Sequence, residues 1–228
     1  KKRVIQLGEN PKSVFMIGAM GIENINKLNL LTKIYFEKSI NFKLAKKNIL
    51  ITYHPVTFEG MTTKNQFNNL LKALSSFRDI NYIFTMPNAD KDGRIIIDLI
   101  KKFVQKFSNK SVYIYNMGQV RYLSAFKYID AVVGNSSSGI IEAPSFKIAT
   151  INIGERQRGR IRAKSVIDCD YNEKSIIKSI KKVFSSDFKK KLKKIINPYD
   201  GGNTSQKSFD VIKKINLKNI MKKNFYDI

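Results

Sequence analysis

The fold is decided by the stretch AVVGNSSSGIIE, which covers residues 131–142. Three apolar residues, Ala131–Val133, predict a short buried strand that ends at Gly134. The serines that follow predict the start of a helix, whose first backbone N–H groups have no partner within the helix. A strand, a glycine-serine turn and a helix in direct succession are typical of α/β sheets, where ligands bind at the carboxyl ends of the strands.

Short apolar runs alternate with amphipathic stretches along the rest of the chain. Most of the runs are nearly continuous in hydrophobicity, as in strands buried on both faces of a parallel sheet. The expected strands are Val14–Ile17, Asn48–Tyr53, Tyr82–Thr85, Ser111–Tyr115, Ala131–Val133, Ala149–Ile153 and Ser165–Ile167. The expected helices include Asn65–Phe77, Gly93–Phe107, Gln119–Ile129, Glu173–Phe184 and Ser205–Ile215. This alternation predicts a Rossmann-like, doubly wound parallel α/β sheet.

Composition excludes several classes of protein. The 228 residues contain no run of 18 apolar residues, so no membrane span is predicted. The first residues, KKRVIQLG, have no apolar region or cleavage site of a signal peptide and no initiator Met, and their pattern is typical of part of a helix. We therefore expect an N-terminal part of the protein to lie outside this sequence. Cys169 is the one cysteine, so no disulfide can form within the chain, and we do not expect a cysteine-based metal site. We expect Cys169 to be a core residue of a reducing, cytoplasmic protein that has no metal or cofactor.

The net charge of +24 raises the question of a nucleic-acid partner. Most of the basic residues are lysines scattered along the expected helices. The densest cluster, residues 189–194, has no aromatic side chains between its lysines on which bases could stack. We therefore expect solvated helix faces and neither a nucleic-acid nor a membrane partner. The alternative is that the positive charge attracts acidic ligands or membrane surfaces.

Polar residues follow two of the first expected strands. His54 comes directly after Tyr53, where an imidazole can hydrogen-bond a phosphate or move a proton. The alternative is a strand-end histidine satisfied by backbone groups. Asn88 and Asp90 follow the next strand, and either could cap the helix after it. Asn88 could instead contact a ligand.

The segment after Val133 has the composition of a phosphate site. Ser136 and Ser137 supply hydroxyl donors at a helix start, and glycines such as Gly139 let a phosphate approach the backbone. The alternative is a helix cap with more serines than it needs. No Gly-Lys-Ser/Thr follows, so this is not a Walker loop. Ser138 stands where the nucleophile elbow of a hydrolase requires glycine.

Charged residues complete the expected site. Glu142 lies six residues after Ser136, which places it on the second turn of the expected helix, where it could accept from ribose hydroxyls or pair with an arginine. The loop GERQRGR, residues 154–160, follows another strand. Its three arginines, Arg156, Arg158 and Arg160, suit a diphosphate, although a solvated basic loop is the alternative. Together these strand-end residues predict a nucleotide site on one rim of the sheet.

These motifs together resemble the hydrolysing UDP-N-acetylglucosamine 2-epimerases of sialic and legionaminic acid synthesis. The resemblance spans nearly the whole chain and is weaker toward non-hydrolysing 2-epimerases and two-domain glycosyltransferases. It rests on VVGNSSSGIIEAP (132–144), INIGERQRGR (151–160), YHPVT (53–57), MPNAD (86–90), NPY (197–199), IQLGENP (5–11) and IGAMG (17–21).

The resemblance implies the C-terminal half of a GT-B-like enzyme with two Rossmann-like domains. Residues 1–20 would form the interdomain junction, residues 21–205 the nucleotide-binding domain, and residues 206–228 a C-terminal helix and tail. The family hydrolyses its UDP-sugar to N-acetylmannosamine and UDP through a 2-acetamidoglucal. Its acid/base carboxylates lie on an N-terminal domain that nothing here matches, so this chain alone is expected to be inactive. A homo-oligomer is implied as well.

The resemblance also implies a role for each matching residue. Ser136 and Ser137, with Gly139 beside them, would hold the diphosphate, and Glu142 would hold the ribose. Arg156 and His54 would contact or stabilise the departing phosphate, and Asn88 would touch the nucleotide. Gly18 and Met20 would lie at the hinge near the sugar nucleotide, and Arg160 is a further possible binding residue.

Part of this assignment stays open. Met20 departs from the small residue or proline expected at its position. The sequence does not choose between UDP-sugars and GDP-sugars, nor does it name the amino sugar. The donor domain of a GT-B glycosyltransferase is an alternative, although it should not carry the loop of residues 156–160 in this form.

Overall fold

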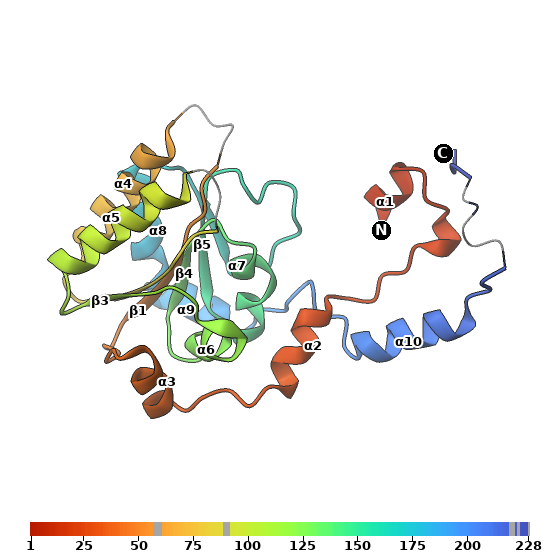
Figure 1. Ribbon diagram of the computed structural model, residues 1–228, viewed down its shortest axis with the longest axis horizontal. Helices are drawn as coiled ribbons and strands as arrows, with labels where there is room; N and C mark the ends of the chain where they lie inside the picture. Colours follow the sequence, from red (N-terminus) through yellow and green to blue (C-terminus); the bar gives the residue numbers. More distant parts are fainter. Residues whose placement is uncertain (57–60, 89–91, 219–221, 223, 228) are drawn as a thin grey trace. The chain divides into compact units, whose positions relative to one another are not determined.

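The computed structural model describes residues 1–56, 61–88, 92–218, 222 and 224–227. Contacts divide the chain into two compact units (Figure 1). The helical unit comprises Lys1–Lys27 with Tyr199–Ile228, and the sheet unit comprises Leu28–Pro198. The expected domain boundaries after residues 20 and 205 stay predictions for the whole protein, because these units are defined within this chain alone.

A six-stranded parallel sheet forms the centre of the sheet unit. Its order is β3-β2-β1-β4-β5-β6, the strand order of a Rossmann-like doubly wound fold. The strands are β1 (Asn48–Thr52), β2 (Asn81–Thr85), β3 (Ser111–Ile114), β4 (Ala131–Gly134), β5 (Ala149–Ile153) and β6 (Val166–Cys169). The expected fold class is thus confirmed.

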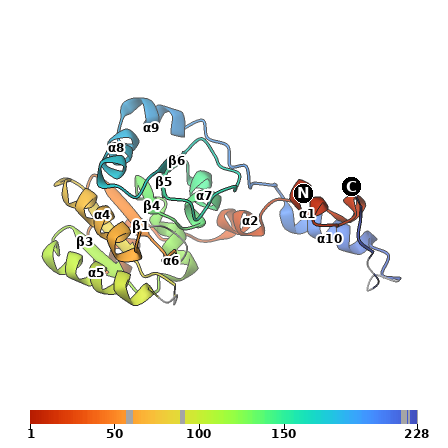
Figure 2. The ribbon, with the colours of Figure 1, turned by 90° about the horizontal axis from the view of Figure 1, so that it is seen from above.

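Helices cover both faces of this sheet (Figure 2). On one face, α4 (Thr63–Ser75), α5 (Gly93–Lys106) and α8 (Glu173–Val183) pack beside one another, and their apolar side chains share a core with alternate residues of β1 and β4. The other face carries α6 (Gly118–Ala125) and α7 (Ser138–Ile141), with α3 (Lys33–Ile40) packed on α6. Each fully buried Leu, Ile or Phe contributes about 1.5–3 kcal/mol, so two covered faces stabilise the sheet strongly.

The helical unit contains α1 (Lys2–Gln6), a 3₁₀ turn η1 (Pro11–Ser13), α2 (Met20–Lys27) and α10 (Thr204–Lys214). Glu23 of α2 ties two of them together. Its carboxylate accepts from the backbone N–H and the hydroxyl of Ser205, both at 2.6 Å, and pairs with Lys27 at 2.5 Å. Because these donors favour the charged form, they lower the pKa of Glu23 to about 2.

One expected strand is not formed and one is displaced, while the others agree with the structure to within one residue at each end. Val14–Ile17 is not a strand, and the exposed side chains of Phe15 and Met16, 52% and 82% accessible, show why: an apolar run forms a strand only where a neighbour pairs with it. The last strand occupies Val166–Cys169, one residue later than expected at its start and two at its end. There β6 pairs with β5 up to Cys169.

The Lys-rich cluster lies partly in α9 (Ser186–Leu192), where Phe188 and Leu192 are buried and the lysines between them are exposed. This agrees with the expected solvated helix face. Among the described residues, no helix has both the length and the hydrophobicity needed to span a membrane.

Candidate functional site at the carboxyl edge of the sheet

The strand order reverses between β1 and β4, where doubly wound sheets hold their ligands. Thr52 and Gly134, the last residues of these strands, face each other in register. Gly134 has a φ of +139°, and a Cβ there would overlap the carbonyl oxygen of Thr52. Only glycine lets the chain leave β4 in this direction. This geometry places residues 134–139, which we call the serine segment, beside the residues that follow β1.

Asn135 joins the loops that follow three strands. Its side chain is fully buried, and its Oδ1 accepts from the backbone N–H of His54 at 2.7 Å. Its Nδ2 donates to the carbonyl of the same residue at 2.8 Å. Its own carbonyl accepts from Arg156 at 3.0 Å and from Gln157 at 2.9 Å. The expected site residues did not include Asn135, although an amide that both donates and accepts suits this position.

His54 is buried at the end of β1, and its Nδ1 accepts from the backbone N–H of Asn88 at 3.2 Å. The structure therefore brings two expected residues together. It also shows backbone satisfaction, the alternative reading of His54, at this nitrogen. Because Nδ1 accepts, the proton of the neutral imidazole lies on Nε2.

The capping roles considered for Asn88 and Asp90 fare differently. Helix α5 begins at Gly93 with Asp92 in the cap position, so Asn88 does not cap it. The carboxylate of Asp92 instead accepts from the hydroxyl of Thr63 at 3.0 Å. Asp90 lies outside the described residues.

The serine segment forms a tight loop before α7. Ser136 Oγ lies 3.2 Å from Ser138 Oγ and accepts from the Ser138 backbone N–H at 3.4 Å. Ser137 occupies the cap position, but its side chain makes no capping hydrogen bond. The interpretation of the serines as helix caps therefore finds no support at Ser137. Gly139 is buried, and a Cβ on it would come within 2.6 Å of the Thr150 methyl, so it allows the loop to pack on β5.

Glu142 follows the single turn of α7, which ends at Ile141. It therefore does not lie on a second turn, as the sequence predicted, because the helix begins at Ser138 rather than Ser136. Its Oε2 is buried without a hydrogen-bond partner, and no ion pair among the described residues includes it. The pairing with arginine is thus absent from the described part of the chain. Burial raises the pKa of this carboxyl group.

Asn197, from the NPY motif, holds the backbone next to Glu142. Its Nδ2 donates to the carbonyl of Ile141 at 2.8 Å and to the hydroxyl of Ser145 at 2.7 Å. These two bonds connect the end of the sheet unit to both sides of Glu142. The backbone position of the carboxylate is therefore set by a residue more than 50 positions away in the sequence.

We expect Glu142→Gln to stabilise the ligand-free protein at neutral pH. A carboxyl group whose pKa is raised by folding contributes stability below its unfolded pKa, near 4.5, and this contribution is lost as pH rises through the folded value. The amide avoids that loss, so its melting temperature should exceed that of the wild type at pH 7 by on the order of 2 °C, and the gap should close toward pH 4. Thermal unfolding across this pH range measures the gap.

Glu37 supplies the matched control for this prediction. It is a buried acid whose pKa is lowered, because it accepts from the Leu44 N–H at 2.9 Å and pairs with Lys43. The sign is opposite: Glu37→Gln should destabilise the protein above pH 4.5. Equal shifts for both variants would contradict the assignment of Glu142 as an uncompensated carboxylate.

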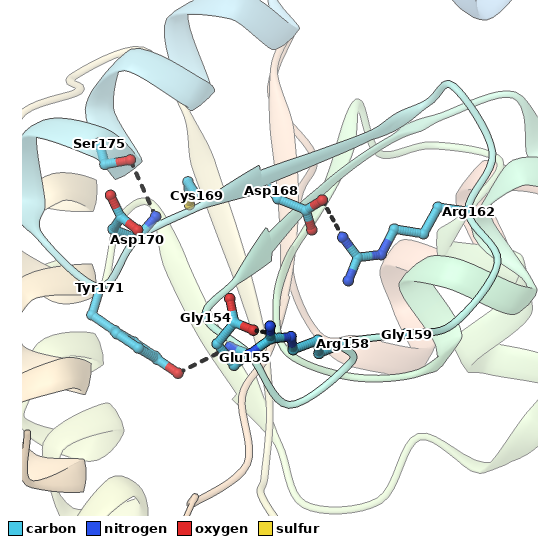
Figure 3. Close-up of a pocket in the computed structure, with 10 residues that line it drawn as sticks. All are labelled: Gly154, Glu155, Arg158, Gly159, Arg162, Asp168, Cys169, Asp170, Tyr171 and Ser175. Atoms are coloured by element: carbon cyan, nitrogen blue, oxygen red, sulfur yellow. Dashed lines mark hydrogen bonds and ion pairs between the residues drawn. The ribbon is translucent and has the colours of Figure 1, made fainter. Parts of the chain in front are cut away.

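The arginine loop divides between two places. Arg156 reaches the serine segment, as expected, through the carbonyl of Asn135. Arg158 instead pairs with Glu155 at 3.4 Å, and both line a neighbouring cavity of about 540 Å³ at the ends of β5 and β6 (Figure 3). Arg160 is exposed. Of the three arginines expected to suit a diphosphate, only Arg158 lines this cavity, and none of the other residues expected to bind the nucleotide does.

Two other expected residues, Gly18 and Met20, belong to the helical unit. Gly18 has a φ of +94°, and a Cβ on it would meet the backbone of Gly201 at 2.5 Å. Met20 begins α2 and is exposed. Gly18 thus serves a close backbone contact within its unit, and the roles of both residues toward a nucleotide stay predictions.

Cys169 is expected to react slowly with thiol reagents. It lies at the end of β6, packed against the core, and burial raises the pKa of its thiol to about 12. Since the thiolate is the reactive form, a disulfide reagent at pH 8 should modify the native protein on the order of 10²-fold more slowly than the protein in guanidinium. Native and unfolded protein reacting at the same rate would contradict the expected role as a core residue.

The strand order and the polar loops at its switch point define the class: a Rossmann-like, doubly wound α/β fold. The model of the UDP-N-acetylglucosamine 2-epimerase family matches residues 1–213. The chain therefore belongs to this family, and the resemblance seen in its motifs is confirmed.

Two curated relatives are similar over the whole chain. A Campylobacter jejuni protein named GDP/UDP-N,N'-diacetylbacillosamine 2-epimerase (hydrolyzing) is 42% identical over 100% of this chain and 59% of its own length. An Escherichia coli protein named polysialic acid biosynthesis protein P7 is 40% identical over 100% of this chain and 58% of its own length. The chain thus spans about three fifths of the length of these relatives.

Solved structures share the fold. The crystal structure of the Neisseria meningitidis UDP-GlcNAc 2-epimerase bound to UDP-GlcNAc superposes with a TM-score of 0.68 at 17% identity, covering 94% of this chain and 58% of that one. At this identity the similarity supports the architecture alone.

Proposed function

We propose that this chain is the C-terminal, nucleotide-sugar-binding part of a cytoplasmic, homo-oligomeric hydrolysing 2-epimerase. The full-length protein converts UDP-N-acetylglucosamine and water into N-acetylmannosamine and UDP, for sialic acid or a related sugar. One observation carries the proposal: Asn135 gathers His54, the serine segment and Arg156 at the switch point of the sheet. Family membership supplies the class of reaction.

In this proposal Ser136 and Ser137 donate to the diphosphate, and Glu142 accepts from the ribose hydroxyls. The unpaired Oε2 of Glu142 supports the second role, because a buried acceptor without a partner costs about 1–3 kcal/mol unless a ligand satisfies it. Arg156 lies beside the serine segment and suits the phosphate oxygens.

The reaction is an elimination followed by an addition. A base on the remaining part of the protein removes the C2 proton, and the C1–O bond to UDP breaks, which leaves a 2-acetamidoglucal. Water then adds its hydroxyl to C1 and its hydrogen to C2. The contribution of this chain is to stabilise the negative charge that develops on the departing diphosphate, through Arg156 and His54. By itself the chain binds UDP without turnover.

A second candidate substrate is a nucleotide-linked N,N'-diacetylbacillosamine. The name of the Campylobacter jejuni relative includes this sugar with either GDP or UDP. The chemistry is the same, since the sugar keeps an acetamido group at C2 next to the bond that breaks.

The full-length protein tests both substrates. It should be incubated without an acceptor sugar, with UDP-N-acetylglucosamine and with UDP- and GDP-N,N'-diacetylbacillosamine, while the nucleoside diphosphate and the free sugar are measured. Release of a 2-epimerised sugar together with the diphosphate supports the proposal and identifies the substrate. Release only when an acceptor is added would identify a glycosyltransferase instead. Free 2-epimerised sugar from the 228-residue chain alone would contradict the need for a second domain.

A further inference from the structure

Five hydroxyl groups follow one another in space along the carboxyl edge of the sheet, and we call them the hydroxyl row: Thr85, Thr52, Tyr122, Ser138 and Ser136. The Thr85 hydroxyl, at the end of β2, donates to that of Thr52, at the end of β1, at 2.8 Å. The hydroxyl of Tyr122 on α6 is hydrogen-bonded to Thr52 and lies 2.5 Å from Ser138 Oγ. Ser138 Oγ in turn lies 3.2 Å from Ser136 Oγ. The hydroxyl row ends at Ser136, the residue proposed to bind the diphosphate.

Tyr122 is the middle member, and its position is fixed by packing. Its ring lies 5.1 Å from that of Phe126, between centroids, and Phe126 is the residue directly after α6. Burial raises the pKa of the phenol, so the hydroxyl keeps its proton at neutral pH. It can therefore accept a hydrogen bond from one neighbouring hydroxyl group and donate one to the next, as every inner member of the hydroxyl row must.

The ends determine the direction of the hydrogen bonds. Thr85 has one hydroxyl hydrogen, and its other acceptor, the Ile51 carbonyl, is farther away at 3.3 Å. When Thr85 donates to Thr52, each hydroxyl accepts from the one behind and donates to the one ahead. Ser136 then accepts from Ser138, and its own hydrogen is directed at an outside acceptor. A diphosphate offers only acceptor oxygens, so it suits a hydroxyl group that donates. Consecutive hydrogen bonds, as in the hydroxyl row, strengthen one another.

We propose that Tyr122 is a positioning residue of the nucleotide site: through Ser138, it holds the Ser136 hydroxyl as a hydrogen-bond donor toward the diphosphate of the bound nucleotide. The inference rests on the proposed function, because it assumes that Ser136 binds phosphate. It adds a residue outside the strand-end loops to the binding machinery and assigns it to the diphosphate rather than to the nucleoside.

The test is calorimetry on the full-length protein with UDP and GDP, and with uridine and guanosine as ligands that lack the phosphates. Tyr122→Phe removes one oxygen atom and should weaken binding of the preferred diphosphate about 5- to 10-fold, while affinity for the nucleoside changes less than about twofold. Ser138→Ala breaks the same link from its other side and should have the same selective effect. Adding Tyr122→Phe to Ser136→Ala should weaken binding no further than Ser136→Ala alone.

Tyr128→Phe is the matched control. The Tyr128 hydroxyl donates to the Leu31 carbonyl at 2.7 Å and does not belong to the hydroxyl row. Tyr128 lies beside the start of β1, where its carbonyl accepts from Asn48. The substitution should cost similar stability and leave nucleotide affinity unchanged. If wild type binds neither UDP nor GDP, the proposed function is overturned. If wild type binds one of them but Tyr122→Phe keeps full affinity, or loses diphosphate and nucleoside affinity equally, the role of Tyr122 alone is overturned.

Discussion

Gly134→Ala is expected to lower the free energy of unfolding by about 4 kcal/mol, enough to prevent many domains of this size from folding. Two effects add. The φ of +139° is costly for any residue with a Cβ, and that Cβ would overlap the carbonyl oxygen of Thr52. Relief by moving β4 away would break the register with β1 and the bond from the Asn135 N–H to the same carbonyl, 3.2 Å long. Urea unfolding of the variant measures the loss.

Gly21→Ala is the control for this variant. Gly21 lies in α2, its φ is outside the left-handed region, and a Cβ there would meet nothing within 4 Å. Alanine should therefore be neutral or stabilise the protein by up to about 1 kcal/mol. If Gly134→Ala unfolds at the same urea concentration as Gly21→Ala, the tight exit from β4 does not exist as described.

The four inner strands of the sheet were predictable because they are buried on both faces. Every residue of β1 and β5 is buried, so these strands consist mostly of apolar and β-branched residues, and such runs stand out in the sequence. Val14–Ile17 has the same composition but no strand to pair with, and pairing is not encoded in the run itself. Strand order is also a property of the whole sheet, so the sequence located the turns after β1 and β4 without showing that they are neighbours.

The site was predictable where chemistry follows a strand end, as at His54, Ser136 and Arg156. It was not predictable where side chains bond across loops. Asn135 acts on a residue 81 positions away, and the hydroxyl of Tyr122 lies 16 positions from that of Ser138. Neither distance has a periodic signature. The role of Glu142 toward a nucleotide stays a prediction, and its expected position on a second turn depended on a helix start that the structure places two residues later.

Asn135→Asp is expected to cost about 3 kcal/mol of stability at neutral pH and to weaken binding of the nucleoside diphosphate at least tenfold. The two side chains have the same shape. One carboxylate oxygen can still accept from the His54 N–H, but the other replaces a donor and faces the carbonyl of His54. A buried charge is then held against an acceptor, which pushes the loops of β1 and β4 apart.

Two features separate this outcome from a general loss of packing. The buried carboxyl would have a raised pKa, so the stability gap to wild type should narrow as pH falls and the carboxyl becomes neutral. Asn48→Asp is the control, because Asn48 also accepts from and donates to one residue, Ala45, at 2.9 Å each, at the opposite end of β1. It should lose comparable stability while nucleotide affinity stays intact. Equal loss of affinity in both variants would mean that the nucleotide site responds to global stability, and that Asn135 does not specifically join the three loops around it.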